Sequence, residues 1–129
     1  NVEYIEPTPV ENACLRSPYV DQIMLVGQDQ KSIGALIVPN KDELEKWAAS
    51  KGIEIGDLNS KPIHDLFKKE LKREVSGRPG YRPDVRVGPF VLLAEPFTIE
   101  NGLLTQTMKV KRPKVSDRYQ DTIDGLYQQ

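Results

Sequence analysis

Cysteine and histidine are nearly absent from this chain of 129 residues, which has one of each, Cys14 and His64. A single cysteine excludes a disulfide framework within the chain and a metal site built from cysteines alone. His64 has no cluster of cysteines or carboxylates at ligand spacing, so we expect a surface or hydrogen-bonded histidine rather than a catalytic or metal-binding one. We expect Cys14 to be a small buried apolar residue rather than a nucleophile, and we expect no metal site.

Long apolar runs and an excess of one charge are missing as well. No stretch approaches the roughly 20 apolar residues that span a bilayer, and no secretory signal is visible. The formal net charge of -1 provides no overall attraction to nucleic acid or anionic lipid. A glycine-rich phosphate loop and a Ser-His-Asp set are both missing. These absences predict a cytoplasmic protein without a transmembrane segment, and they leave peripheral attachment to a membrane open.

Three short apolar runs predict the strands of a small sheet. Residues 21–27 and 32–39, separated by the polar residues 28–31, are typical of a β-hairpin. Residues 89–93 are a third run, too short for a helix and rich in large apolar side chains. The core candidates of the hairpin are Ile23, Leu25, Leu36 and Val38.

Four segments predict helices. Thr8 and Glu11 have the spacing of a capping box, with Pro9 at the first helical position. Asn40 and Ser60 are candidate caps of two further helices, and Gly52 is a stop signal. The helices are expected at residues 9–16, 41–50, 61–76 and 114–127. The charged face of the third, Lys68, Lys69, Glu70, Lys72, Arg73 and Glu74, is expected in solvent. Together these elements predict a single compact α+β domain with a three-stranded sheet of residues 23–27, 35–38 and 90–93, flanked by three to four helices.

The stretch 97–114, FTIENGLLTQTMKVKRPK, presents a basic run behind a turn signal. Asn101-Gly102 predicts the turn, and residues 103–110 alternate towards extended structure. Lys109 and Lys111 would share one face if that segment is extended.

Within this stretch, NGLLTQTMKVKR resembles the last motif of the adenylate-forming superfamily, in the form found in long-chain fatty acyl-CoA and acyl-acyl-carrier-protein synthetases. Gln106 stands where that branch usually has proline. The first residues, NVEYIEP, similarly resemble the NGENIEP stretch of the same branch, with Val2 in place of glycine and Tyr4 in place of asparagine.

The resemblance implies that residues 1–129 are a mobile, lysine-bearing carboxy-terminal domain, a fragment of a longer enzyme whose large nucleotide-binding domain lies outside this sequence. It implies that Lys109 is the catalytic lysine and that Val2, Glu3 and Tyr4 line the tunnel for a pantetheine thiol. Candidate phosphate contacts are Thr107, Lys111 and Arg112. From composition alone, the simplest interpretation of Lys109 is one of several lysines on a solvated edge.

The implied activity is that of an ATP-dependent fatty acid ligase, which forms an acyl-adenylate and then an acyl thioester with coenzyme A or acyl carrier protein. The full enzyme would use ATP and Mg, with the amino-terminal domain, the fatty acid and the thiol as partners. The isolated domain is expected to be inactive and to bind no cofactor by itself.

Two other hypotheses come from different functional classes. The first is an independent binding module that grips nucleic acid or an acidic protein through basic residues, and the second is a purely structural domain. The net charge argues against a nucleic-acid partner, and no aromatic residue is interleaved with the basic run. A salt titration against an oligonucleotide would discriminate, because phosphate contacts give a steep salt dependence. The basic residues in question are Arg78, Arg82, Arg86, Lys109, Lys111 and Arg112.

Overall fold

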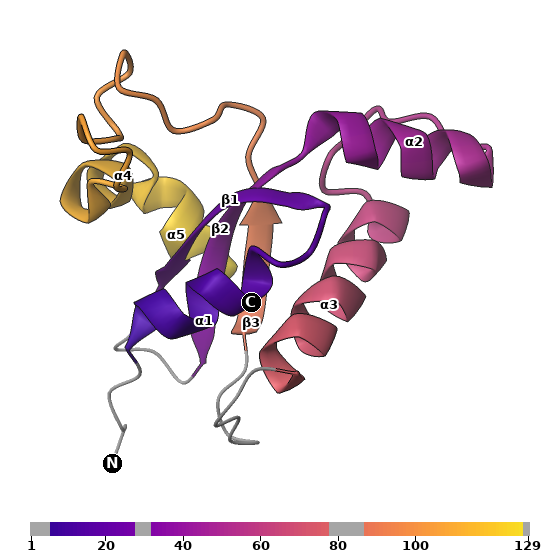
Figure 1. Ribbon diagram of the computed structural model, residues 1–129, viewed down its shortest axis with the longest axis horizontal. Helices are drawn as coiled ribbons and strands as arrows, with labels where there is room; N and C mark the ends of the chain where they lie inside the picture. Colours follow the sequence, from indigo (N-terminus) through magenta and orange to yellow (C-terminus); the bar gives the residue numbers. More distant parts are fainter. Residues whose placement is uncertain (1–5, 28–31, 78–86, 128–129) are drawn as a thin grey trace.

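The computed structural model describes residues 6–27, 32–77 and 87–127. Three strands form one sheet in the order β1-β2-β3. β1 (Val20–Val26) and β2 (Ile33–Pro39) pair antiparallel, as the hairpin prediction required, and β3 (Val87–Leu92) pairs with β2 in parallel. A parallel pair needs a long crossover connection, which α2 (Lys41–Lys51) and α3 (Lys61–Ser76) provide. The predicted α+β class with a three-stranded sheet is confirmed (Figure 1).

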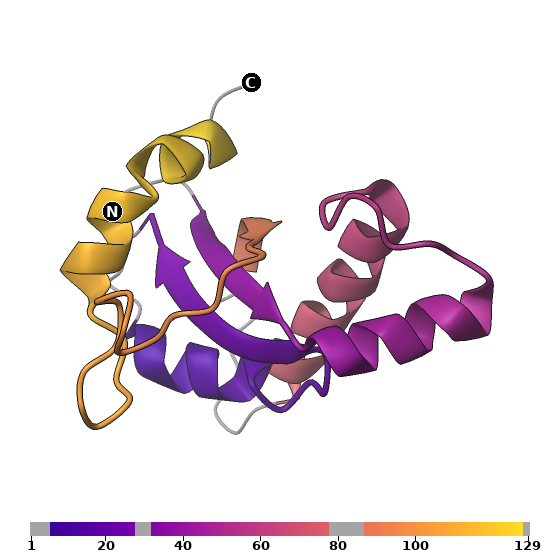
Figure 2. The same ribbon diagram turned by 90° about the horizontal axis from the view of Figure 1, so that it is seen from above.

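The sheet is covered on both faces, and each face has its own apolar core. Alternate side chains of a strand point to opposite faces, so Ile23 and Leu25 join one cluster while Met24 and Val26 join the other. Figure 2 shows α3 on one side of the sheet, and α4 (Arg112–Arg118) and α5 (Gln120–Leu126) on the other. All four core candidates of the hairpin are buried, although Leu36 and Val38 belong to the second cluster rather than the first.

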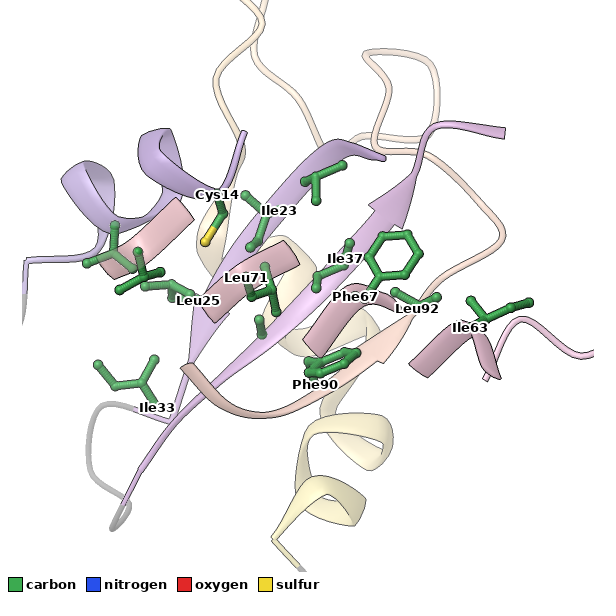
Figure 3. Packing of buried hydrophobic residues seen from close by; sticks show 14 of the residues in the cluster. Cys14, Ile23, Leu25, Ile33, Ile37, Ile63, Phe67, Leu71, Phe90 and Leu92 are labelled. Carbon is green, nitrogen blue, oxygen red and sulfur yellow. The ribbon is translucent and has the colours of Figure 1, made fainter. Parts of the chain in front are cut away.

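The first cluster, which we call the helical face, lies beneath α1 (Pro7–Cys14) and α3. Phe67 of α3 is fully buried there, and Figure 3 shows it among residues from all three strands. Cys14 is also buried as predicted. Burial, together with the nearby carboxylates of Glu11 and Glu74, raises the pKa of its thiol to about 12. His64 stacks flat on the Phe90 ring, with centroids 4.3 Å apart.

Local signals placed α2 and α3 correctly. The Asn40 side chain accepts a hydrogen bond from the Glu43 N–H, and Gly52 ends α2 in the left-handed conformation that lacks a steric cost for glycine. α3 spans the predicted residues after Ser60, although Ser60 makes no capping hydrogen bond with its side chain.

The capping box predicted at Thr8 is wrong. α1 begins at Pro7, so Thr8 lies inside its first turn, and no side chain caps the helix. The Glu11 carboxylate instead points at β1, where it accepts a hydrogen bond of 2.8 Å from the Leu25 N–H. A partner distant in sequence has replaced the expected local one.

The solvent-exposed position predicted for Glu70 is also wrong. Glu70 is 5% exposed, and its Oε1 accepts hydrogen bonds from the Ser17 hydroxyl (2.7 Å) and from Arg73 (2.8 Å). A carboxylate can lie at this depth because both partners satisfy it. Glu70 therefore fastens α3 to the segment that joins α1 and β1.

The helix predicted at residues 114–127 is two helices, α4 and α5, which meet at Tyr119 (φ -109°, ψ 24°). The described residues accordingly hold five helices rather than three to four. The break lets Val115 of α4 and both Ile123 and Leu126 of α5 contact the same apolar cluster. None of the described helices is long and apolar enough to cross a membrane.

Candidate functional site

The segment between β3 and α4, residues 93–111, covers the second face of the sheet and carries the basic run. Figure 1 shows this segment, in orange, leaving the end of β3 and returning to α4. Its buried residues belong to the second cluster, which we call the loop face. They are Leu93, Phe97, Leu103 and Leu104.

A side-chain amide fixes the beginning of this segment to the edge of the sheet. Gln22 of β1 donates from Nε2 to the Phe97 carbonyl (2.9 Å) and accepts from the Phe97 N–H at Oε1 (2.7 Å). The amide thereby pairs with the backbone of Phe97 as a neighbouring strand would. Phe97 itself is 1% exposed, so polar and apolar contacts hold the same residue.

Asn101 organises the turn that follows. Its Oδ1 accepts from the Thr98 N–H (2.9 Å), and its own N–H donates to Thr98 Oγ1 (2.9 Å). Its Nδ2 donates to the Pro96 carbonyl (2.9 Å) and to Glu95 (3.2 Å), and Glu95 also pairs with Arg118 of α4. Gly102 has φ 81°, a conformation that glycine adopts without strain. The Asn101-Gly102 turn is confirmed, and Asn101 is its hub.

The segment that carries Lys109 is a tight turn rather than the extended strand suggested by alternation. Leu104 and Val110 form an isolated antiparallel bridge, and the Lys111 N–H donates to the Leu103 carbonyl (2.8 Å). The chain reverses between them, with Met108 at φ 65°. The prediction of extended structure is wrong here because Met108 adopts a left-handed backbone conformation, which a residue with a side chain disfavours. We call residues 104–110 the lysine turn.

Lys109 lies on the exposed outer part of the lysine turn, next to Met108, which is 64% exposed. Within the described residues no carboxylate lies within ion-pair distance of the Lys109 ammonium. Thr107 and Lys111 are exposed beside it. The structure therefore gathers three of the predicted site residues on or directly beside one accessible turn.

Arg112, the fourth, turns back into the domain. Its two terminal nitrogens donate to the two carboxylate oxygens of Glu11 at 2.8 and 2.6 Å, a bidentate pair between residues 101 positions apart. Glu11 is only 7% exposed and also holds the Leu25 N–H. The pair fastens the start of α4, which closely follows the lysine turn, to α1 and β1. Glu11 had no signal in the sequence, because its partner is remote and its local spacing suggested a cap.

Thr105 is the other residue that sequence reasoning missed. Its hydroxyl accepts from the Lys109 N–H (3.0 Å), and its N–H donates to the Lys109 carbonyl (2.8 Å). A threonine ahead of a turn is a general signal for such side-chain bonds, and it could have been noticed. The predicted tunnel residues Val2, Glu3 and Tyr4 lie outside the described residues, as do Arg78, Arg82 and Arg86.

Metal and nucleophile chemistry has no support in the described part of the chain. No three residues among His, Cys, Asp and Glu gather there in a way that could hold a metal ion. What the site offers is a solvent-facing ammonium on a turn whose base is fastened to a folded core.

Comparison with known proteins shows what the sequence is similar to. Residues 1–56 match the family described as the AMP-binding enzyme C-terminal domain. The chain is 35% identical to the chloroplastic long-chain-fatty-acid–[acyl-carrier-protein] ligase AEE15 of Arabidopsis thaliana, over 97% of this chain and 16% of that protein. It is also 35% identical to the human long-chain-fatty-acid–CoA ligase 1, over 97% of this chain and 18% of that protein. The chain thus spans less than a fifth of these relatives.

A solved structure has the same fold. The A domain of carboxylic acid reductase from Segniliparus rugosus, in complex with AMP and a co-purified carboxylic acid, superposes with a TM-score of 0.79 at 27% identity, over 97% of this chain and 18% of that one. The similarity covers both faces of the sheet, since it covers nearly the whole chain. Residues 1–56 thus match the carboxy-terminal domain of AMP-binding enzymes, and nearly the whole chain is similar to long-chain fatty acid–CoA and fatty acid–acyl-carrier-protein ligases.

Proposed function

We propose that residues 1–129 form the lysine-bearing carboxy-terminal domain of a longer ATP-dependent fatty acid ligase, whose nucleotide-binding domain is another part of the same protein. The observation that supports this most directly is the lysine turn. The motif around Lys109 resembles the lysine motif of adenylate-forming enzymes, and the turn presents that lysine exposed while its base is buried at Leu103 and Leu104.

In the first half-reaction, a fatty acid carboxylate attacks the α-phosphorus of ATP, and the α-phosphorus–oxygen bond to pyrophosphate breaks. Two anions must approach, and negative charge grows on the phosphoryl oxygens. The Lys109 ammonium is a compact charge on a long stem that can lie between carboxylate and α-phosphate. It acts as an electrostatic clamp and takes no proton. Such a contact contributes about 3 kcal/mol to stabilising the transition state. Mg accompanies the ATP in the nucleotide-binding domain.

In the second half-reaction, a thiol of coenzyme A or acyl carrier protein displaces AMP and forms the thioester. The domain rotates between the two steps, so Lys109 faces the reacting atoms only in the first. Val2, Glu3 and Tyr4 would then line the path of the pantetheine arm.

Among the candidate phosphate contacts, Thr107 and Lys111 are exposed on or beside the lysine turn and free to approach nucleotide. Arg112 commits two of its donors to Glu11.

The test compares Lys109→Ala and Lys109→Arg with wild type in the full-length enzyme. Pyrophosphate release measures adenylation, and conversion of supplied acyl-adenylate to thioester measures the second step. Lys109→Ala should lower adenylation by about a hundredfold or more and leave thioester formation intact. Lys109→Arg should also fail, because a planar guanidinium does not reproduce a point charge.

Lys72→Ala is the matched control, since Lys72 is an exposed lysine of α3 on the opposite side of the sheet. It should leave both steps unchanged. Equal losses in the two steps for Lys109→Ala, or no loss in adenylation, would contradict the proposal. Calorimetry of the isolated chain with ATP should show no binding, and tight stoichiometric binding would mean that the nucleotide site had been assigned to the wrong domain.

A further inference from the structure

Thr105 lies at the start of the lysine turn and forms two hydrogen bonds with the backbone of Lys109. Its N–H donates to the Lys109 carbonyl at 2.8 Å, and its carbonyl accepts from the Met108 N–H at 2.9 Å. Its hydroxyl accepts from the Lys109 N–H at 3.0 Å and lies 3.0 Å from the Thr107 hydroxyl. Both backbone polar groups of Lys109 are therefore bound to one residue.

The first residues of the lysine turn are held in place by the apolar core. Leu104, directly before Thr105, is 3% exposed and bridges to Val110. The backbone that leads into Thr105 is thus fixed by the buried Leu104. Met108 is held at φ 65°, a conformation that its side chain disfavours. The two backbone bonds would remain with any residue other than proline at position 105, since only proline lacks the backbone N–H. The bond from the hydroxyl is the part that depends on threonine.

We propose that Thr105 is a positioning residue, whose hydroxyl fixes the backbone of Lys109 and so aims the Lys109 ammonium at the reacting atoms of the adenylation step. The inference rests on the proposed function of Lys109. Electrostatic stabilisation of a transition state depends on placement, since a displacement of about 1 Å at a catalytic group can cost about a hundredfold in rate. Thr105 itself need not touch substrate.

The experiment replaces the hydroxyl with a methyl group of similar size in the full-length enzyme. Thr105→Val should lower kcat for pyrophosphate release about tenfold, leave KM for ATP within about twofold, and leave the conversion of supplied acyl-adenylate to thioester unchanged. Thr105→Ser, which keeps the hydroxyl, should restore adenylation to within about twofold of wild type. A threonine outside the turn provides the matched control: Thr122→Val, in α5, should leave both steps unchanged.

Combination with Lys109→Ala tests the route of the effect. If the hydroxyl acts through Lys109, Thr105→Val should cause no further loss in the Lys109→Ala background, because the group it positions is gone. A direct contact of the hydroxyl with substrate, or a general loss of structure, would instead give the same tenfold loss in either background and would overturn the proposal.

The remaining outcomes separate this inference from the function on which it rests. Full adenylation by Thr105→Val, beside a loss in Lys109→Ala, would overturn the positioning role and keep the assignment of Lys109. Failure of Thr105→Ser to restore the rate would also overturn it. Full adenylation by Lys109→Ala would remove the proposed function, and the positioning role with it.

Discussion

The two faces of the sheet bury similar side chains but are held by different means. On the helical face, α1 and α3 supply most of the cover, and the side chains that pack there repeat at helical spacing along α3. On the loop face, the cover is residues 93–111 followed by two short helices, and much of its order comes from hydrogen bonds between side chains and backbone. A helix satisfies its own backbone, whereas an irregular segment must find partners elsewhere.

This difference suggests separate roles for the two faces, one in the stability of the domain and one in presenting Lys109 to solvent. The helical face is a continuous apolar contact, in which many small contributions add up. The loop face depends on a few residues with several bonds each, namely Gln22, Asn101, Thr105 and Arg112. A turn held in this way can present a charged side chain to solvent while its base remains fixed. We infer that the helical face mainly keeps the domain folded and that the loop face keeps Lys109 in place.

Both edges of the sheet are also closed by side chains. At the β1 edge Gln22 pairs with Phe97, and at the β3 edge Asn59 donates to the Leu92 carbonyl (3.1 Å) and accepts from its N–H (2.9 Å). Unpaired strand edges invite association with other chains. At the β1 edge, the contact between Gln22 and Phe97 both covers the strand edge and anchors residues 93–111.

The largest effect is expected from a matched pair of phenylalanines, Phe67 on the helical face and Phe97 on the loop face, which are 0% and 1% exposed. Each Phe→Ala change should lower the free energy of unfolding by about 3–5 kcal/mol, because each leaves a cavity. At a temperature where both variants remain folded, only Phe97→Ala should also slow adenylation per folded molecule. Urea unfolding and pyrophosphate release measure the two quantities, and an equal loss of adenylation in both variants would remove the distinction between the faces.

Next come the two buried carboxylates, each of which has an arginine partner. Arg112→Met should destabilise the domain by about 2 kcal/mol, because it leaves Glu11 with one of its three hydrogen bonds. Arg73→Met should cost less, about 1 kcal/mol, since Arg73 is more exposed, pairs within one helix, and makes a single bond to Glu70. Chemical denaturation of both variants would decide, and a larger loss at Arg73 would reverse the ranking.

The helical face could be predicted from the sequence because its signals are local. Asn40 and Gly52 bound α2, and the apolar spacing of residues 61–76 located α3 to the residue. Local reasoning failed where a residue's partner is remote. The spacing of Glu11 predicts a helix cap, but its carboxylate binds Arg112. The spacing of Glu70 predicts an exposed side chain, but its carboxylate is buried and accepts a hydrogen bond from the Ser17 hydroxyl. The residue pattern of one segment does not show which distant segment will pack against it in the fold.

The site was only partly predictable. The motif around Lys109 predicts a catalytic lysine by resemblance, and the Asn101-Gly102 turn followed from turn chemistry. The reversal at Met108 could not be expected, because neither glycine nor asparagine marks it. It depends on the Leu104–Val110 bridge and on Thr105, and both become visible only once the turn is closed.

A pH titration would sharpen the contrast through Cys14, which lies on the helical face. Its pKa rises from 9.0 to about 12 on folding, so between these values the unfolded chain releases a proton that the folded chain keeps. The free energy of unfolding should therefore be unaffected by this group below pH 9 and fall by about 1.4 kcal/mol per pH unit between pH 9 and about 12. Because other groups titrate there too, the measured quantity is the difference between wild type and Cys14→Ala. A difference independent of pH between 9 and 11 would mean that the thiolate is tolerated at this position.

The smallest effect concerns Met108, and it should change stability and activity in opposite directions. At φ 65° a methionine is strained by about 1 kcal/mol, and with 64% of its surface exposed it contributes little packing in return. Met108→Gly removes the strain, although the freer glycine also favours the unfolded chain, so the net gain in the free energy of unfolding should be about 0.5 kcal/mol.

The same glycine should loosen the turn next to Lys109 and slow adenylation two- to threefold, leaving thioester formation unchanged. Gly52, which ends α2 at φ 67° with open space around it, allows the reverse comparison on the other side of the domain. Gly52→Ala should introduce strain of similar size and lower stability by about 1 kcal/mol without any effect on adenylation. If Met108→Gly raised both the stability and the rate of adenylation, the strained methionine would have no part in presenting the lysine, and the order of the turn would have to come from Thr105 and the Leu104–Val110 bridge alone.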